Sequence, residues 1–96
     1  MDVKAKNELL KLIESAISEC VRVGQDALSN GQQWMEEDAK TSQSQFEKIR
    51  YQLLNDTLPR SDGAGLGITR ALSEWAPKSL YDAGLAVEEY YIRTWN

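Results

Sequence analysis

The sequence contains no histidine among its 96 residues and only one cysteine, Cys20. Without histidine, the chain lacks the usual general base near neutral pH and the commonest metal ligand. A single cysteine cannot form an intramolecular disulfide, which is consistent with a reducing compartment. Cys20 falls on the apolar side of a predicted helix, so we expect a buried structural thiol rather than a nucleophile. These absences predict a protein that is not an enzyme and that needs no metal and no cofactor.

Long hydrophobic runs and basic clusters are also missing. No apolar run approaches the roughly 20 residues that a membrane-spanning helix needs. Lys11 and Glu14 interrupt the first apolar stretch, which is not the pattern of a signal peptide. The net charge of −4 is spread along the chain, with no basic patch for phosphate. We therefore expect a cytoplasmic protein that binds neither nucleic acid directly nor a membrane surface.

The patterns that remain are helical. Apolar residues recur at spacings of three and four over about residues 2–28, where Asp2 can cap the first helix. This stripe contains Leu9, Ile13, Ala16, Cys20, Val23 and Ala27. Four further apolar residues widen it beyond a two-helix seam, so we expect this helix to contact more than one neighbour. They are Leu10, Leu12, Ile17 and Val21. A second helix is predicted over about residues 32–58, because Pro59 cannot continue it.

A tight turn is predicted between these two helices at Asn30-Gly31, since both residue types tolerate the left-handed backbone that ends a helix. The apolar register shifts by one residue here, which favours a turn over a continuous rod. Ser29 and Gln32 are predicted to form a capping box. So short a turn makes the helices antiparallel neighbours. Small residues then meet near the turn, and large residues meet at the open end, where we expect the C-terminal segment to pack.

The C-terminal part is predicted to contain a loop and two shorter helices. Residues 59–67 are interrupted by proline and three glycines, and this pattern indicates a flexible connector. The glycines match no phosphate-binding fingerprint. Helices are predicted over about residues 68–76 and 79–95, with a break at Pro77.

The fold prediction is therefore all-α, in a single domain over residues 1–96. A long antiparallel helical hairpin carries two shorter C-terminal helices, as in a four-helix bundle. Ser79 and Asp82 are predicted to cap the last helix. That helix is apolar over most of its circumference, so dimerisation through it would complete the bundle.

Aromatic residues are concentrated in the last quarter of the chain. They are Trp75, Tyr81, Tyr90, Tyr91 and Trp95. Tyrosine and tryptophan are common interface anchors, because they bury a large area and keep a polar group. We predict Tyr90, Tyr91 and Trp95 as partner-binding residues, with a role in the core as the alternative. Trp34 lies near the hairpin turn, where we expect it either to fold back over Leu28 or to be a second contact point.

Acidic residues give a further candidate surface. Glu36, Glu37 and Asp38 are consecutive, and Glu47 follows on the same predicted helix. These carboxylates, like the pair Glu88-Glu89, are expected to be solvated, since nothing places a second set of metal ligands beside them. They would alternatively face a basic groove on a protein partner.

The leading hypothesis is a small, non-enzymatic protein-interaction module that occludes or scaffolds a protein partner. A second hypothesis is an acidic inhibitor of a nucleic-acid-binding machine, of the kind that phages and mobile elements encode. A third is a structural homodimer subunit whose partner is a second copy. No motif predicts a small-molecule substrate.

Overall fold

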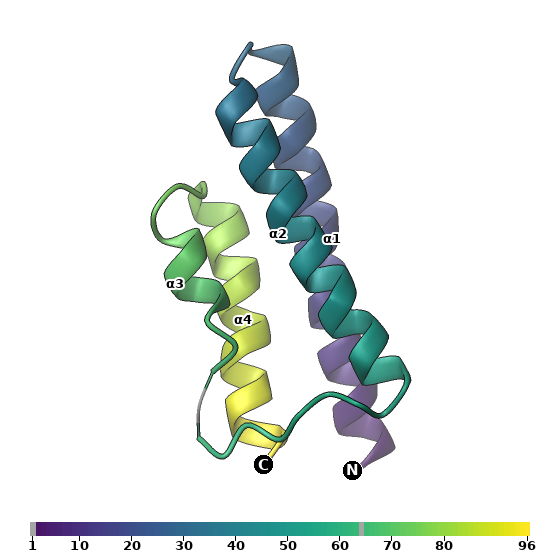
Figure 1. Cartoon of the computed structure of the whole chain (residues 1–96). Coiled ribbons are helices and arrows are strands. Elements are labelled where there is room, and N and C mark those ends of the chain that lie inside the picture. The colour runs from purple at the N-terminus through teal and green to yellow at the C-terminus, as the bar shows by residue number, and fades with distance from the viewer. Residues whose placement is uncertain (1, 64) are drawn as a thin grey trace.

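A computed structural model describes residues 2–63 and 65–96, and it contains four helices in that part of the chain (Figure 1). They are α1 (Val3–Ser29), α2 (Gln33–Leu54), α3 (Ile68–Leu72) and α4 (Lys78–Thr94). Met1 and Ala64, which belong to the predicted domain and the predicted loop, lie outside the described residues. The all-α prediction, with a long hairpin followed by two shorter helices, is confirmed.

The turn between α1 and α2 closes as predicted. Gly31 adopts a positive φ of 70°. The N–H of Gln32 donates to the carbonyl of Ala27 at 2.8 Å, and the N–H of Gly31 donates to that of Leu28 at 3.2 Å. These two bonds form the Schellman motif that ends many helices. The predicted capping box is wrong, because Gln32 occupies the N-cap of α2 without any side-chain hydrogen bond. Asp2 does cap α1, accepting from the N–H of Lys4.

The two arms of the hairpin pair in the expected antiparallel register. Near the turn, a Cβ placed on Gly24 would lie 3.5 Å from the Cβ of Ala39. At the open end, the Lys6 ammonium lies 2.9 Å from the Asp56 carboxylate. The arms therefore stay in contact along their full length, and the molecule measures 43 × 21 × 18 Å.

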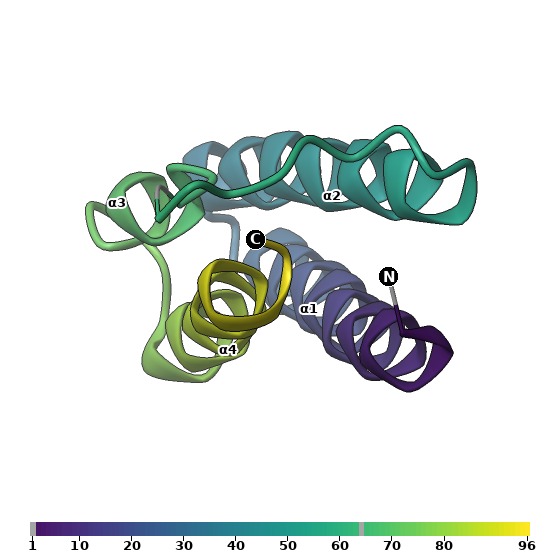
Figure 2. The same ribbon diagram turned by 90° about the horizontal axis from the view of Figure 1, so that it is seen from below.

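The second layer is formed by α4, which packs against α1, and by α3, which packs against α4 (Figure 2). Phe46 of α2 reaches across to α4, where its ring lies close to Gly84. The core is continuous through these elements. Its fully buried side chains include Leu9, Ile13, Cys20, Phe46, Leu53, Leu72, Leu80 and Val87. The C-terminal segment thus covers the apolar half of the hairpin, as the pairing of large residues predicts.

The end of α2 differs from the prediction, since the helix stops at Leu54 rather than at residue 58. Asp56 takes a left-handed φ of 57°, and the N–H of Thr57 donates to the carbonyl of Gln52 at 2.8 Å. The Asn55 side chain also donates to the carbonyl of Tyr51. A Schellman motif without glycine therefore ends the helix before proline can act on it.

The C-terminal helices also differ in detail. α3 ends at Leu72, and a turn over residues 73–75 replaces the rest of the predicted helix. Pro77 breaks the chain as expected and is the N-cap of α4. The predicted Ser79 and Asp82 cap is wrong. The Ser79 hydroxyl accepts a hydrogen bond from Arg22 of α1, and Asp82 pairs with Lys78.

Candidate binding surfaces

One long face of the hairpin has no neighbouring element in the part of the chain that the structure describes. It lies on the side of α1 and α2 that faces away from α4, and we call it the open face. It follows from the second apolar stripe of α1, which is displaced by one residue from the stripe that forms the core. Leu10 and Ile17 of this stripe are half-buried, whereas Val21 and Leu28 are exposed.

Exposed apolar side chains gather on this face. Six large hydrophobic side chains are exposed among the described residues, and five of them belong to the open face or continue its stripe. These five are Val3, Val21, Leu28, Tyr51 and Leu54. Scattered exposed apolar residues are ordinary on a protein surface, but a contiguous row of them along one face marks an interaction surface.

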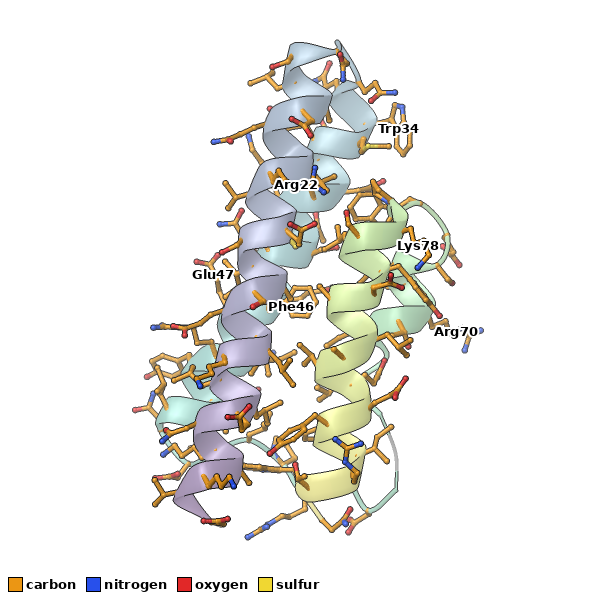
Figure 3. All side chains as sticks on the ribbon, turned by 180° about the vertical axis from the view of Figure 1, so that it is seen from behind. Arg22, Trp34, Phe46, Glu47, Arg70 and Lys78 are labelled. Carbon is orange, nitrogen blue, oxygen red and sulfur yellow. The ribbon has the colours of Figure 1, made fainter. Side chains whose placement is uncertain are left out.

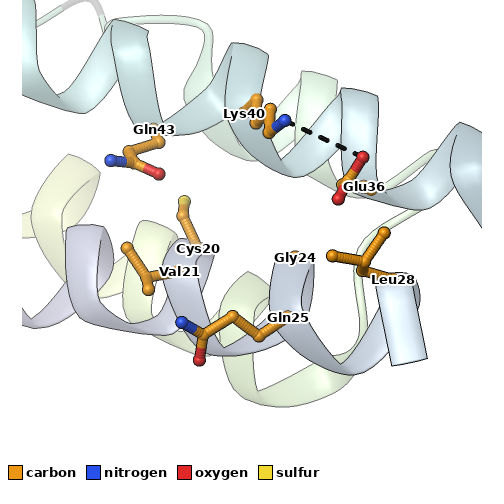
Figure 4. A pocket seen from close by; sticks show the side chains of 8 residues that line it. All are labelled: Cys20, Val21, Gly24, Gln25, Leu28, Glu36, Lys40 and Gln43. Carbon is orange, nitrogen blue, oxygen red and sulfur yellow. Dashed lines mark ion pairs between the residues drawn. The ribbon is translucent and has the colours of Figure 1, made fainter. Parts of the chain in front are cut away.

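A groove runs along the open face between the two helices. It consists of two adjoining hollows, of about 270 Å³ towards the turn and about 510 Å³ towards the open end. From α1 the lining residues include Ile17, Val21, Gly24 and Leu28. From α2 they include Lys40, Gln43, Glu47, Tyr51 and Leu54. Figure 4 shows the hollow near the turn, where Cys20 and Gly24 form the floor. We call the two hollows together the open groove.

The charges on the rim of the open groove mostly neutralise one another. Arg50 lies 3.3 Å from Glu14 across the two helices, and Lys40 lies 3.8 Å from Glu36 along α2. Glu47 makes no ion pair with any residue that the structure describes, and its side chain is exposed. One uncompensated carboxylate therefore stands beside the apolar floor.

Cys20 is inert in this position. Burial raises the pKa of its thiol to about 12, and the negative charges of Glu19 and Glu47 add to the effect. The thiolate is the reactive form of cysteine, so a thiol with so high a pKa is a poor nucleophile and a poor metal ligand. The side chain thus contributes apolar surface rather than chemistry.

Two of the predicted C-terminal anchors lie inside the molecule. Tyr91 and Trp95 are only 3% and 4% exposed. The Tyr91 hydroxyl donates to the carbonyl of Pro59, and the Trp95 indole N–H donates to that of Leu58 at 3.1 Å. Both rings therefore fasten the segment after α2 onto α4. In the folded chain they present almost no surface to a partner.

The other predicted aromatic contacts are more accessible. Tyr90 is half-buried, and the guanidinium of Arg93 lies 5.3 Å from the centre of its ring. Trp34 is 54% exposed. Figure 3 shows that Trp34 lies on the same side of the hairpin as Lys78 and Arg70, whereas Glu47 lies on the opposite side. Trp34 is therefore not part of the open groove.

The predicted acidic surface does not face in one direction. Glu36 turns towards the open groove, and its side chain is 17% exposed. Glu37 is exposed and accepts a hydrogen bond from Gln33, whereas Asp38 is half-buried. Three consecutive residues of a helix point about 100° apart, so this sequence run cannot form a single acidic patch.

The most elaborate polar contact involves Glu88 and was not predicted from the sequence. This side chain was expected to be solvated, but the residue is only 6% exposed. Its carboxylate accepts hydrogen bonds from the N–H groups of Leu66, Gly67 and Thr69 and from the Thr69 hydroxyl. The prediction of a solvated Glu88 is therefore wrong, because the carboxylate satisfies the free N–H groups before and at the start of α3.

The electrostatics of Glu88 follow from this cradle. Burial alone would raise the pKa of its carboxyl, but the four hydrogen bonds to the charged form outweigh burial and leave the pKa below its ordinary value. A Cβ on Gly65 would lie only 2.9 Å from the Glu88 Cδ, so glycine is needed there for the close approach. The glycines of the loop thus surround an internal carboxylate rather than an external anion.

Other kinds of site find no support in the described residues. No three acidic or cysteine side chains gather there as a metal site requires. None of the helices in residues 2–63 and 65–96 is both long and apolar enough to cross a bilayer. Comparison with protein-family models, curated proteins and solved structures finds no match to this chain.

Proposed function

We propose that this protein is a small, non-enzymatic protein-interaction module that binds a protein partner through the open groove. One observation carries the proposal: four of the six large hydrophobic side chains that are exposed among the described residues line one groove, Val21 and Leu28 from α1 and Tyr51 and Leu54 from α2. Contact with a partner would remove this apolar surface from water, at about 25 cal/mol for each Å² buried. Occlusion or scaffolding of that partner follows from binding alone and needs no chemistry.

The open face is large enough for such a role. The molecule is 43 Å long and 21 Å wide in its two larger dimensions. A stable interface buries about 800 Å² on each partner, and one side of a body of these dimensions offers about that area. The two hollows lie in line along the hairpin, so a single partner could contact both.

The test compares two exposed apolar residues near the turn. Leu28 lines the open groove, and Trp34 lies on the other side of the hairpin. A photo-cross-linking residue at Val21, compared with one at the exposed Arg70 of α3, first identifies the protein that contacts the groove in the native host. The purified partner is then titrated with two variants of the protein, Leu28→Lys and Trp34→Lys. Leu28→Lys is expected to weaken binding at least about tenfold. Trp34→Lys is expected to leave binding unchanged.

The converse result would refute the proposal. If Trp34→Lys weakened binding and Leu28→Lys did not, the partner would contact the face of the hairpin that carries α3 and α4. Circular dichroism of each variant is the folding control, and both side chains are more than half exposed, so little stability is at risk. The acidic-inhibitor and homodimer hypotheses stay predictions, since no observation on the described residues favours them over the open groove.

A further inference from the structure

We infer that the occupant of the open groove is a single amphipathic helix of the partner, which places a lysine or arginine against Glu47. This inference rests on the proposed function and specifies the chemistry of the partner. It follows from the spacing of the apolar residues, from the dimensions of the groove and from its charge.

The spacing on α1 is the first argument. The buried stripe repeats every seven residues, and it is covered by other helices. The open stripe has the same period, one residue further along: Leu10, Ile17 and Gly24 form one series, and Val21 and Leu28 form the other. A seven-residue repeat keeps an apolar seam facing a neighbouring helix over several turns. The open stripe is therefore suited to a second helical neighbour rather than to an extended strand or a loop.

The dimensions of the groove agree with one helix. Neighbouring helices lie about 8–10 Å apart, and the furrow between two of them accommodates one more helix of the same diameter. The lining residues extend from Glu14 to Leu28 on α1, which corresponds to about 21 Å along the helix axis. An occupant of about four turns would fill this length. Helix-in-groove binding of this kind is a common mode of peptide recognition.

The charge of the rim identifies one polar feature of the occupant. Arg50 and Lys40 already have acidic partners, but Glu47 has none among the described residues. A helix seated in the groove would remove water from the Glu47 carboxylate, and an unpaired charge is costly to desolvate. A basic side chain on the flank of the helix would offset this cost. Glu47 would in turn discriminate against helices that carry an acidic side chain at that position.

The same residue disfavours a second copy of this chain. On α2 the residues that line the groove extend from Glu36 to Leu54, and Glu47 lies near the middle of this range. A two-fold axis through the middle of the groove would bring each Glu47 towards its symmetry mate, because such an interface joins a patch to itself. Two like charges at the centre of an interface oppose association.

The experiment uses the intact protein and two synthetic helices of about three heptads. Both carry leucine and isoleucine at the apolar a and d positions of each heptad. They differ only at the flanking e and g positions of the central heptad, which are lysine in one helix and glutamate in the other. The lysine helix is expected to bind at least about tenfold more tightly than the glutamate helix. Its binding is expected to shift the amide NMR signals of residues that line the groove.

Charge variants locate the preference. Glu47→Gln is expected to reduce the preference for the lysine helix to less than about threefold. Glu89→Gln, which removes the same charge from an exposed position on α4, is expected to leave it unchanged. Equal binding of both helices, or a preference that survives Glu47→Gln, would overturn the role of Glu47.

Three further outcomes separate this inference from the proposed function. If neither helix binds while Leu28→Lys still weakens binding of the cross-linked partner, the groove is a binding surface and the helical occupant is wrong. If the solution mass is that of a dimer and Val21→Lys makes it a monomer, the occupant is a second copy and the inference is wrong. If Leu28→Lys also has no effect on the partner, the proposed function itself is wrong.

Discussion

At the scale of single residues, Glu88 is the group with the most specific environment. It is a carboxylate inside a small helical protein, and it accepts four hydrogen bonds from α3 and the residues before it. A buried charge is tolerated only where hydrogen bonds compensate for the loss of water. The contact therefore joins α4 to α3 through one side chain, and its removal leaves several N–H groups without an acceptor.

Glu88→Gln is expected to lower the free energy of unfolding at neutral pH by about 2 kcal/mol, because an amide accepts fewer of these bonds and leaves buried donors unsatisfied. The pH dependence has a definite sign. The pKa of Glu88 is lower in the folded chain than its ordinary value of 4.5, so its contribution is complete above that pH and is lost as the pH falls through the folded pKa. Urea denaturation at a series of pH values measures both effects.

Glu89→Gln is the matched control for this prediction, because Glu89 is the exposed neighbour of the same residue type on α4. Its free energy of unfolding is expected to stay within about 0.5 kcal/mol of the parent value. A difference between parent and Glu88→Gln that failed to shrink below pH 4.5 would contradict the assignment of the charge to the cradle.

A second prediction concerns Tyr91. Tyr91→Phe removes the hydroxyl that donates to the carbonyl of Pro59 and leaves the ring in place. The expected result is a loss of about 1 kcal/mol in the free energy of unfolding, with partner affinity unchanged. Tyr81→Phe is the control, because Tyr81 is a half-buried residue whose hydroxyl forms no hydrogen bond among the described residues. Reduced partner affinity with unchanged stability would instead restore Tyr91 as an interface anchor.

These residues show which properties of a side chain cannot be predicted from the sequence pattern. The apolar character of Tyr91 and Trp95 was evident, but an aromatic on an apolar helix face suits a core and an interface equally well. Helical spacing does distinguish Glu88 from Glu89, because only Glu88 lies on the buried stripe of α4 with Gly84 and Tyr91. Spacing within α4 does not show which donors the carboxylate meets, since these N–H groups belong to α3 and the residues before it.

At the scale of helices, start and end signals were only partly predictable. Asn30-Gly31 ended α1 as expected, because glycine takes the left-handed position at no steric cost. At the end of α2, Asp56 takes the same position, although a non-glycine residue with positive φ is uncommon. Because such a position is rarely occupied by aspartate, the sequence instead predicted Pro59 as the residue that ends α2. The ion pair from Lys6 to Asp56 lies at the same point and exists only once the hairpin has formed.

The two helical glycines give a prediction at this scale, because they have opposite surroundings. A Cβ on Gly84 would lie 3.3 Å from Ile68 and in steric conflict with the buried Leu72. Gly84→Ala is thus expected to destabilise the protein by about 1–2 kcal/mol, since overpacking costs more than the helix gains from alanine. A Cβ on Gly24 would instead make ordinary contact with Ala39. Gly24→Ala is thus expected to stabilise the protein by about 0.5–1 kcal/mol.

Thermal and urea denaturation of the two alanine variants side by side check this pair of predictions. Both replace glycine by alanine within a helix, so the change in intrinsic helix propensity is the same and the difference between them reports packing alone. Equal shifts in the same direction would show that α3 moves away from α4 at no cost, and would contradict the close contact at Gly84.

At the scale of the whole molecule, the hairpin and its two layers could be predicted because heptad spacing fixes which faces of α1 meet other helices. The open groove could be predicted only in part. The widened stripe of α1 predicts a further neighbouring helix, and we expected α4 to be that neighbour. In the structure α4 packs on the opposite side, where Arg22 contacts Ser79, so the stripe that includes Val21 and Leu28 stays uncovered.

The same arrangement leaves the hairpin tip as a two-helix segment. Beyond Arg22 the hairpin projects past the first turn of α4, as Figure 1 shows, and Leu28 is 64% exposed. Local opening is easiest where few apolar contacts are buried. Amides of residues 23–29 and 33–39 are therefore expected to exchange at a lower opening free energy than those of 13–20, as measured by hydrogen exchange at increasing urea concentration. Gly24→Ala is expected to raise protection of the tip more than of residues 13–20. A helix bound in the open groove is also expected to raise protection of the tip. Uniform exchange of all these amides at the global unfolding free energy would contradict an independently opening tip.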